Sequence, residues 1–275
     1  MAVRLAVCVL SLFPWATVAG ASLEDTYIAF APDSIHGLPA LALMNPVDGS
    51  ILPVGLPDML VEGAPAWAPD GSGIVAVVWL ADERVYDLFM FPADGSEPRR
   101  ITHDDLRERG PSWSPDGRRI VFSIGDGFIQ TSAIHTIGAD GSDRVRLTED
   151  ALAARDPEWA PDGQTILFSL YRDGTSRIAV MDADGTGVRE ITSGDGSKWS
   201  PSWSPDGETI AYYGSSPGSH GLFVARSDGS EAVLISESGA WPTWSPDGRR
   251  LAYADRIDDR WALFTINVDG TGAAP

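Results

Sequence analysis

The chain has 275 residues with 20 basic and 39 acidic side chains, which gives a formal net charge of −19. This excess of acid argues against a nucleic-acid-binding protein, because phosphate contacts need clustered Lys and Arg. The 43 % hydrophobic content and the 10 Trp residues argue against disorder, and the single Cys excludes a disulfide framework or a thiolate zinc site.

Residues 1–21 have the features of a signal peptide. Arg4 supplies the positive start, residues 5–18 form the apolar stretch, and residues 19–21 read Ala-Gly-Ala, which fits a cleavage site. A membrane anchor is the alternative, but the apolar run is short and Pro14 interrupts it. We therefore expect a mature chain of residues 22–275 in the periplasm or outside the cell, with no membrane span after cleavage.

Two short motifs recur in phase along the rest of the chain. Trp-x-Pro-Asp-Gly occurs five times, at intervals of roughly 41 to 46 residues, and a Pro stands two residues before each Trp. Its Trp and Asp residues are Trp67 and Asp70, Trp113 and Asp116, Trp159 and Asp162, Trp203 and Asp206, and Trp244 and Asp247. Asp-Gly followed by Ser or Thr recurs at Asp48, Asp94, Asp140, Asp184, Asp228 and Asp269. Such periodicity predicts a repeat protein.

Each repeat predicts four antiparallel strands. Pro-Asp-Gly is a tight turn, because Pro fixes φ and Gly accepts a positive φ, and a short apolar run such as residues 74–78 follows it. A second strand, such as residues 87–90, leads into the Asp-Gly hairpin turn, and a short outer strand such as residues 99–102 follows. Four strands in each repeat of this length are typical of a β-propeller blade.

The repeat resembles that of the TolB-like β-propellers, whose WD40-like repeat carries Trp-Ser-Pro-Asp-Gly and a later Asp-Gly-Ser. The resemblance covers residues 27–271 and implies an all-β, six-bladed propeller of four-stranded antiparallel blades in one domain, residues 22–275. We expect the chain to lack the α/β domain that precedes the propeller in TolB. The blades are expected at about 27–60, 64–105, 110–149, 156–193, 200–236 and 241–275, with no inner strand in the first and no outer strand in the last.

The turn motifs fall on one face of such a propeller, and the remaining loops, which vary between repeats, fall on the other. Variable loops on a rigid scaffold are where binding usually occurs, and the residues before each repeated Pro enter the inner strand near the channel mouth. We predict a partner-binding site there, made of His103, Arg109, Arg155, Asp156, Lys198, Trp199, His220 and Trp241. The alternative is that these Trp residues pack between blades and the cations pair with nearby acids.

The His residues at 36, 103, 135 and 220 come from different repeats and lack ligand spacing, so we expect no metal site, no cofactor and no catalytic residue. The sequence predicts an exported, monomeric, non-enzymatic binding module for a protein or peptide partner. One alternative is a lyase-like or hydrolase-like propeller that acts on a carbohydrate or small molecule at the channel mouth. A structural propeller without any ligand is the other.

Overall fold

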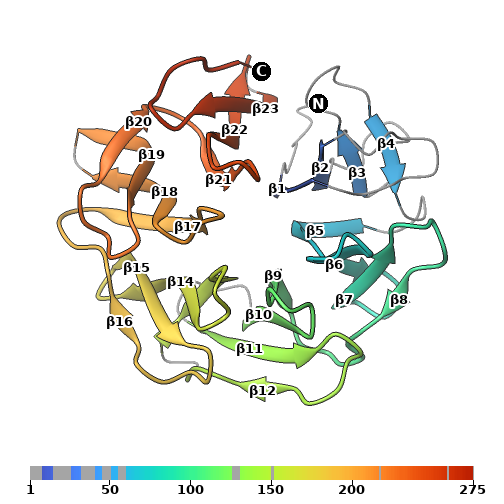
Figure 1. Ribbon diagram of the computed structural model, residues 1–275. Coiled ribbons are helices and arrows are strands. Elements are labelled where there is room, and N and C mark those ends of the chain that lie inside the picture. Colours follow the sequence, from blue (N-terminus) through green and yellow to red (C-terminus); the bar gives the residue numbers. More distant parts are fainter. Residues whose placement is uncertain are drawn as a thin grey trace.

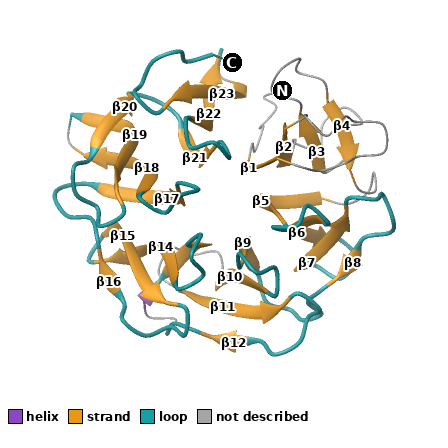
Figure 2. Ribbon diagram, in the orientation of Figure 1, coloured by secondary structure: helices purple, strands orange, loops and turns teal. Residues whose placement is uncertain are grey.

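The computed structural model is a ring of antiparallel β-sheets around a central axis (Figure 1). It describes four strands between residues 8 and 54, and then residues 60–125, 131–149, 152–216, 218–258 and 260–274. Figure 2 shows that the ring consists of strands and the turns that join them. No helix in the described residues is long and apolar enough to cross a membrane.

The strands follow one another outward from the axis within each sheet. The first blade contains β1 (Cys8–Pro14), β2 (Thr26–Ala31), β3 (Leu41–Met44) and β4 (Ile51–Val54). The second contains β5 (Leu60–Trp67), β6 (Gly73–Leu80), β7 (Val85–Pro92) and β8 (Arg99–Arg100). The third contains β9 (Glu108–Trp113), β10 (Arg119–Gly125), β11 (Ser132–Gly138) and β12 (Val145–Arg146).

The second half of the chain repeats this arrangement. The fourth blade contains β13 (Ala154–Trp159), β14 (Thr165–Arg172), β15 (Thr175–Asp182) and β16 (Arg189–Glu190). The fifth contains β17 (Ser197–Trp203), β18 (Thr209–Ser216), β19 (Ser219–Arg226) and β20 (Val233–Ser236). The last sheet contains β21 (Ala240–Trp244), β22 (Arg250–Ile257) and β23 (Arg260–Asn267).

The structure corrects the prediction for the first blade, which the sequence left without an inner strand. Cys8–Pro14, which fall in the predicted signal peptide, form β1 and pair antiparallel with β2. This pairing satisfies backbone groups at the inner edge of β2 that would otherwise need water or another strand. β1 also contacts both β5 and β21, so it lies between the second blade and the last sheet. The first blade thus includes residues that precede Ser22, the predicted start of the propeller.

The structure has five complete blades rather than the predicted six blades with an incomplete first and last, because five sheets have four strands and the last has three. Only Ala274 extends the last sheet, through a single antiparallel bridge to Thr265. Its two hydrogen bonds are Thr265 N to Ala274 O, 2.7 Å, and Ala274 N to Thr265 O, 2.9 Å. The predicted absence of a full outer strand is therefore confirmed for the described residues. One bridge satisfies the polar backbone of β23 at one point.

The two turn motifs lie on one face, the turn face, as predicted. In the third blade Ala139 N, from the Asp-Gly turn, donates to Arg118 O of the Pro-Asp-Gly turn, 2.9 Å. Within the Pro-Asp-Gly turn Asp116 Oδ1 accepts from Ser114 Oγ, 2.6 Å, and from Arg118 N, 3.0 Å, while Gly117 has a φ of 68°. The opposite face, the loop face, carries the other connections, such as residues 81–84 and 101–107.

The hydrophobic core lies between neighbouring blades. One cluster joins Val121 and Ile134 of the third blade to Ile166 and Phe168 of the fourth, with the repeated Trp159 among them. Some repeated Trp residues also hydrogen-bond to the preceding blade. Trp113 Nε1 donates to Ala66 O, 3.2 Å, and Trp244 Nε1 donates to Ser202 O, 3.1 Å. Trp113 and Trp244 thus each fasten one inner strand to the preceding one, whereas Trp159 and Trp203 contribute through apolar packing, since their Nε1 atoms have no hydrogen-bond partner.

Glycine in the Asp-Gly turn completes the contact with the preceding blade in the third, fourth and fifth blades. A Cβ at Gly141, Gly185 or Gly229 would lie 2.8, 2.7 or 1.8 Å from a carbonyl oxygen of the preceding outer strand. All three glycines have positive φ values, 92°, 88° and 80°. Both the conformation and the space therefore require Gly, which explains why the Asp-Gly motif keeps its phase with the blades.

Candidate functional site

The inner strands β9, β13, β17 and β21 each carry a bulge at the repeated Pro, where two residues face one residue of the neighbouring strand. The residue before Pro has a positive φ in all four strands: 55° at Gly110, 50° at Asp156, 50° at Ser200 and 52° at Trp241. This conformation costs a non-glycine residue about 1 kcal/mol or more. Because bulges re-aim side chains, we regard these positions as a candidate site.

Two arginines converge on one glutamate where the inner strands begin. Arg107 Nη2 donates to Glu62 Oε1, 2.7 Å, and Arg109 Nη2 lies 3.4 Å from the same oxygen. The Arg107 guanidinium also lies over the Tyr86 ring, 4.3 Å from its centroid. All three charged side chains are about one-third exposed. A single carboxylate balances only one of the two guanidinium charges, so positive charge remains at this end of the ring.

Arg155 and Asp156 continue this row on β13. Arg155 Nε donates to Ser132 Oγ, 3.3 Å, and Ser169 Oγ donates to Asp156 Oδ2, 3.4 Å. The Ser169 hydroxyl also accepts from Ser200 N, 3.2 Å, which connects the row to β17. The charges of Arg155 and Arg109 both act on Asp156. We call Glu62, Arg107, Arg109, Arg155 and Asp156 the axial charge cluster.

Three other predicted residues lie farther around the ring on β17 and β21. Lys198 Nζ donates to Asp195 O, 3.1 Å, and burial, together with the charge of Arg177, lowers the pKa of Lys198. Trp199 stacks on Tyr213 of the same blade, with ring centroids 5.5 Å apart. Trp241 is half-buried. These side chains share the inner strands with the axial charge cluster but belong to other blades.

The two predicted histidines are not brought together. His103 is exposed on the loop between β8 and β9, and His220 is exposed on β19, three blades farther along the chain. His36 lies outside the described residues. The two predicted histidines therefore come from different parts of the ring.

Three carboxylates that the sequence analysis did not identify meet at the junction of the second and third blades. Asp87 comes from β7, Asp104 from the loop after β8, and Glu108 from the start of β9, and one oxygen from each lies within 4.8 Å of the others. We call these three residues the junction carboxylates. Asp87 and Glu108 are fully buried, whereas the side chain of Asp104 is about one-third exposed. Their arrangement provides three oxygen donors at one point.

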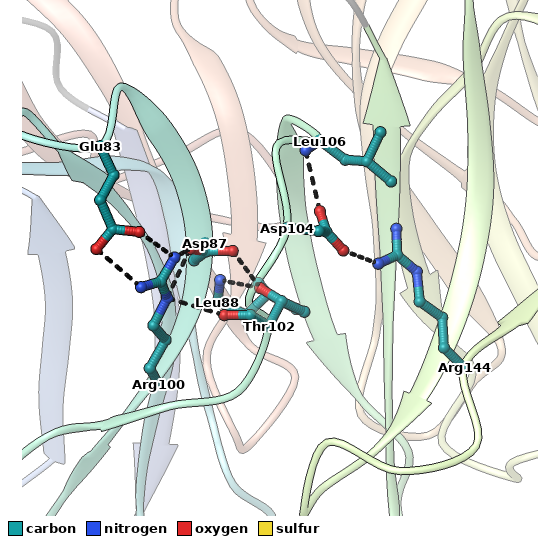
Figure 3. A network of polar contacts seen from close by, with 8 residues as sticks. All are labelled: Glu83, Asp87, Leu88, Arg100, Thr102, Asp104, Leu106 and Arg144. Atoms are coloured by element: carbon teal, nitrogen blue, oxygen red, sulfur yellow. Dashed lines mark hydrogen bonds and ion pairs between the residues drawn. The ribbon is translucent and has the colours of Figure 1, made fainter.

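Arginines hold two of the junction carboxylates (Figure 3). Arg100 Nε donates to Asp87 Oδ2, 2.7 Å, while its terminal nitrogens donate to Glu83, 3.0 and 2.9 Å. Arg144 forms an ion pair with Asp104, whose other oxygen accepts from Leu106 N, 3.0 Å. No comparable contact serves the third carboxylate.

Glu108 has no hydrogen-bond partner for either of its buried carboxylate oxygens. Burial, reinforced by the charge of Asp104, raises the pKa of Glu108 to about 8. A comparison of the repeats in phase could have found this site, because Asp87 stands where the other blades have Ala133, Arg177, Gly221 and Ala262. A search for ligand spacing along the chain misses it.

A second glutamate, which is half-buried, serves the scaffold. Glu158 on β13 accepts a hydrogen bond from Trp203 N of the next blade, 3.2 Å, and burial raises its pKa to about 8. The contrast with Glu108 is informative, because Glu158 has a donor from a neighbouring inner strand and Glu108 has none.

A cavity of about 510 Å³ opens beside the axial charge cluster, between the second and third blades. Its lining includes the backbone or side chains of Arg84, Tyr86, Arg107, Ile124 and Thr131. Asp105 also lines the cavity, so the lining has two cationic residues, one acidic residue and one aromatic residue, and Arg107 belongs to both the cavity and the axial charge cluster. The two features therefore form one continuous surface on the loop face.

Comparison with known proteins agrees with the fold. Residues 126–275, more than half of the chain, match the family described as TolB beta propeller domain. No curated protein matches the chain by sequence.

Solved structures resemble the chain at low sequence identity. TolB from Acinetobacter baumannii superposes with a TM-score of 0.71 at 21 % identity, covering 96 % of this chain and 61 % of that chain. A puromycin-hydrolyzing peptidase of Mycobacterium tuberculosis gives 0.69 at 12 % identity, covering 97 % and 43 %. Oligogalacturonate lyase from Vibrio parahaemolyticus gives 0.64 at 14 % identity, covering 99 % and 86 %. The chain thus spans about three fifths of the length of that TolB, and the likeness to these proteins is one of fold alone.

Proposed function

Because the chain belongs to the TolB beta propeller domain family, we propose that it is an exported, non-enzymatic binding module for a protein or peptide partner. The partner sits on the loop face, over the axial charge cluster and the adjoining cavity. Three rules of recognition support this choice of surface: variable loops, strained backbone and exposed arginine beside aromatic rings are all typical of binding sites.

The observation that carries the proposal is the convergence of Arg107 and Arg109 on the single carboxylate of Glu62. The chain has a net charge of −19, yet cations outnumber acids at this point. A carboxylate of the partner, from an Asp, a Glu or a chain terminus, can accept hydrogen bonds from the guanidinium N–H groups that do not bind Glu62. Arg suits such bidentate contacts. The cavity beside Tyr86 accommodates an apolar side chain next to that carboxylate.

The binding site is tested by capture from an envelope extract, with mass spectrometry to compare the proteins recovered. The Arg109→Ala/Arg155→Ala/Trp241→Ala variant should lose the partner that the wild type retains. The matched control is Arg118→Ala/Arg249→Ala, which removes two exposed arginines of the turn face. Equal recovery by all three proteins would contradict the site, whereas equal loss by both variants would point to general charge rather than to this surface.

Export is the second part of the proposal, and it concerns residues that β1 also uses. Cleavage after Ala21 would remove β1 and leave β2 as the inner edge of the first blade. Cys8 is the only Cys of the chain, so a thiol-reactive label applied to the unfolded protein reports whether this segment is present. We expect the exported protein to remain unlabelled and to have the mass of a monomeric chain that begins at Ser22. Labelled protein in the exported fraction would refute cleavage.

Catalysis on a carbohydrate or small molecule at the same surface is the alternative function. Its support is the fold shared with oligogalacturonate lyase and the two exposed histidines, His103 and His220. Binding is favoured because those histidines come from different elements, the loop after β8 and strand β19. Thermal shift with oligogalacturonate fragments separates the two functions: stabilisation of the wild type by the fragments, together with their breakdown, would favour the enzyme.

A further inference from the structure

We propose that the junction carboxylates, Asp87, Asp104 and Glu108, bind one Ca²⁺ ion between the second and third blades. The site is distinct from the axial charge cluster, and it does not depend on the partner proposed above. It lies beneath the loop that carries Asp104, between strand β7 of one blade and strand β9 of the next.

The spacing of the oxygens suits calcium. One oxygen from each residue lies within 4.8 Å of the other two. Two ligands on opposite sides of one Ca²⁺ are about 5 Å apart, because each Ca–O distance is about 2.3–2.6 Å. The corresponding separation for Mg²⁺, about 4 Å, also falls within this limit, but Mg²⁺ demands near-ideal octahedral geometry, whereas Ca²⁺ accepts flexible sets of oxygen ligands. The three carboxylates can therefore share a calcium ion with little movement, with water completing its coordination.

Glu108 supplies the independent reason to expect a ligand. Its side chain is fully buried, and neither carboxylate oxygen has a hydrogen-bond partner. A buried carboxylate without donors is costly, and most buried polar groups in native proteins are satisfied. Glu158 on the next inner strand shows how this fold normally satisfies such a group, through Trp203 N at 3.2 Å. A cation held against Asp87 and Asp104 would satisfy both free oxygens of Glu108 at once.

The charges around the site also balance with a divalent ion. Glu83 joins the three junction carboxylates through Arg100, so four carboxylates face two guanidinium groups, those of Arg100 and Arg144. With all four carboxylates ionised, two negative charges remain, which is the charge that Ca²⁺ neutralises. Figure 3 shows Arg100 on the Glu83 side of Asp87 and Arg144 on the far side of Asp104, so that the two arginines flank the aspartates.

Solvent can reach the site through Asp104, whose side chain is about one-third exposed. A bound ion would connect the second blade, through Asp87, to the third blade, through Glu108. It would also fix the loop of residues 101–107, which ends at Arg107 of the axial charge cluster. Calcium is thus expected to increase the stability of the ring.

The test measures Ca²⁺ binding to the full chain after treatment with EDTA and dialysis. Isothermal titration with CaCl2 should give one ion per chain, and Ca²⁺ should raise the unfolding temperature above that in EDTA. Glu108→Gln should weaken the affinity about 100-fold or more, since it removes a ligand oxygen and its charge. Asp104→Asn, at a partly exposed position, is the second variant, and it should also lose most of the affinity while folding normally.

Glu158→Gln is the matched control, because it neutralises a half-buried glutamate on an inner strand outside the junction. Its affinity for Ca²⁺ should be within about twofold of that of the wild type, as expected for an independent site. Three results would overturn the proposal: no binding of Ca²⁺ by the wild type, a preference for Mg²⁺ or Mn²⁺ over Ca²⁺, or unchanged Ca²⁺ affinity in both Glu108→Gln and Asp104→Asn. If Glu108→Gln fails to fold, Asp104→Asn alone decides between these results.

Discussion

The two faces of the ring differ in how much each blade resembles the next. On the turn face the same hydrogen bonds recur, with Ser114 and Asp116 in one blade matched by Ser204 and Asp206 in another. On the loop face the junction of the second and third blades brings three carboxylates together, whereas no equivalent of Asp87 in the other described blades is acidic. The repeated residues therefore form the scaffold, and the candidate binding residues occur where the repeats differ.

The sharpest way to test this contrast is to remove one Trp of each kind. Trp159→Ala should cost about 3–5 kcal/mol, because the repeated Trp is buried in the core between two blades. Trp199→Ala should cost about 1–2 kcal/mol, because Trp199 is half-buried and its ring contact is stacking on Tyr213. Urea unfolding measures both values, and equal losses would erase the proposed difference between scaffold and surface.

Glycines provide a second pair with opposite surroundings. Gly229→Ala on the turn face should cost about 2–4 kcal/mol, because its Cβ would lie 1.8 Å from Ile191 O. Gly174→Ala on the loop face should cost about 1 kcal/mol, because its φ of 81° matches that of Gly229 while nothing lies within 4 Å of its Cβ. The difference between the two losses of unfolding free energy measures the effect of the contact between blades. A loss at Gly229 no larger than that at Gly174 would show that the backbone at this contact shifts easily to make room for the methyl group.

The half-buried Glu158 predicts a pH dependence of stability that is smaller than these effects. Burial raises its pKa from 4.5 to about 8, so the folded state holds the proton more tightly than the unfolded state. Its contribution to stability is therefore full below about pH 4.5 and falls as the pH rises toward 8. Between pH 5 and 8, Glu158→Gln should gain about 1–2 kcal/mol relative to the wild type. Urea unfolding across this range measures the gain, and parallel curves for the two proteins would refute it.

The smallest effect is expected at a single turn carboxylate. The hydroxyl of Ser204 and the backbone N–H of Glu208 lower the pKa of Asp206 below 3.8. Its stabilising effect is therefore present above pH 3.8 and disappears as the pH falls through the lowered pKa. At pH 7, Asp206→Ala should lose about 0.5 kcal/mol, a value reduced by solvent exposure. Asp206→Asn, which keeps an acceptor oxygen, should lose less, and the loss in Asp206→Ala should vanish at low pH.

Much of the fold could be predicted from the sequence because the turns that define it are local. Pro-Asp-Gly and Asp-Gly fix backbone angles within a few residues, so the strands between them follow from spacing alone. The inner strand of the first blade could not be predicted in this way, because Cys8–Pro14 carry no turn motif and resemble an apolar leader. Its position depends on pairing with β2 and contact with β21, which are distant in sequence.

The candidate site was predicted only in part. Arg109, Arg155 and Asp156 were found because they flank the repeated Pro, whose position in the inner strand is fixed by the repeat. Glu62 and Arg107 were missed, since their importance lies in contacts between blades rather than in a motif. Asp87, Asp104 and Glu108 were missed for the same reason: they come from two strands and a loop, and only the closed ring brings their oxygens together.

The contact of each Asp-Gly turn with the outer strand before it has a consequence for how such a chain can change length. Gly185 approaches Leu147 O and Gly229 approaches Ile191 O, so the repeat between them carries one half of each of two equivalent joints. Duplication of a whole repeat would therefore supply matching halves for every new joint, whereas an insertion of half a repeat would leave one joint without its partner. Growth or loss by entire blades is the change that this architecture tolerates, and the ring must then adjust only its closure.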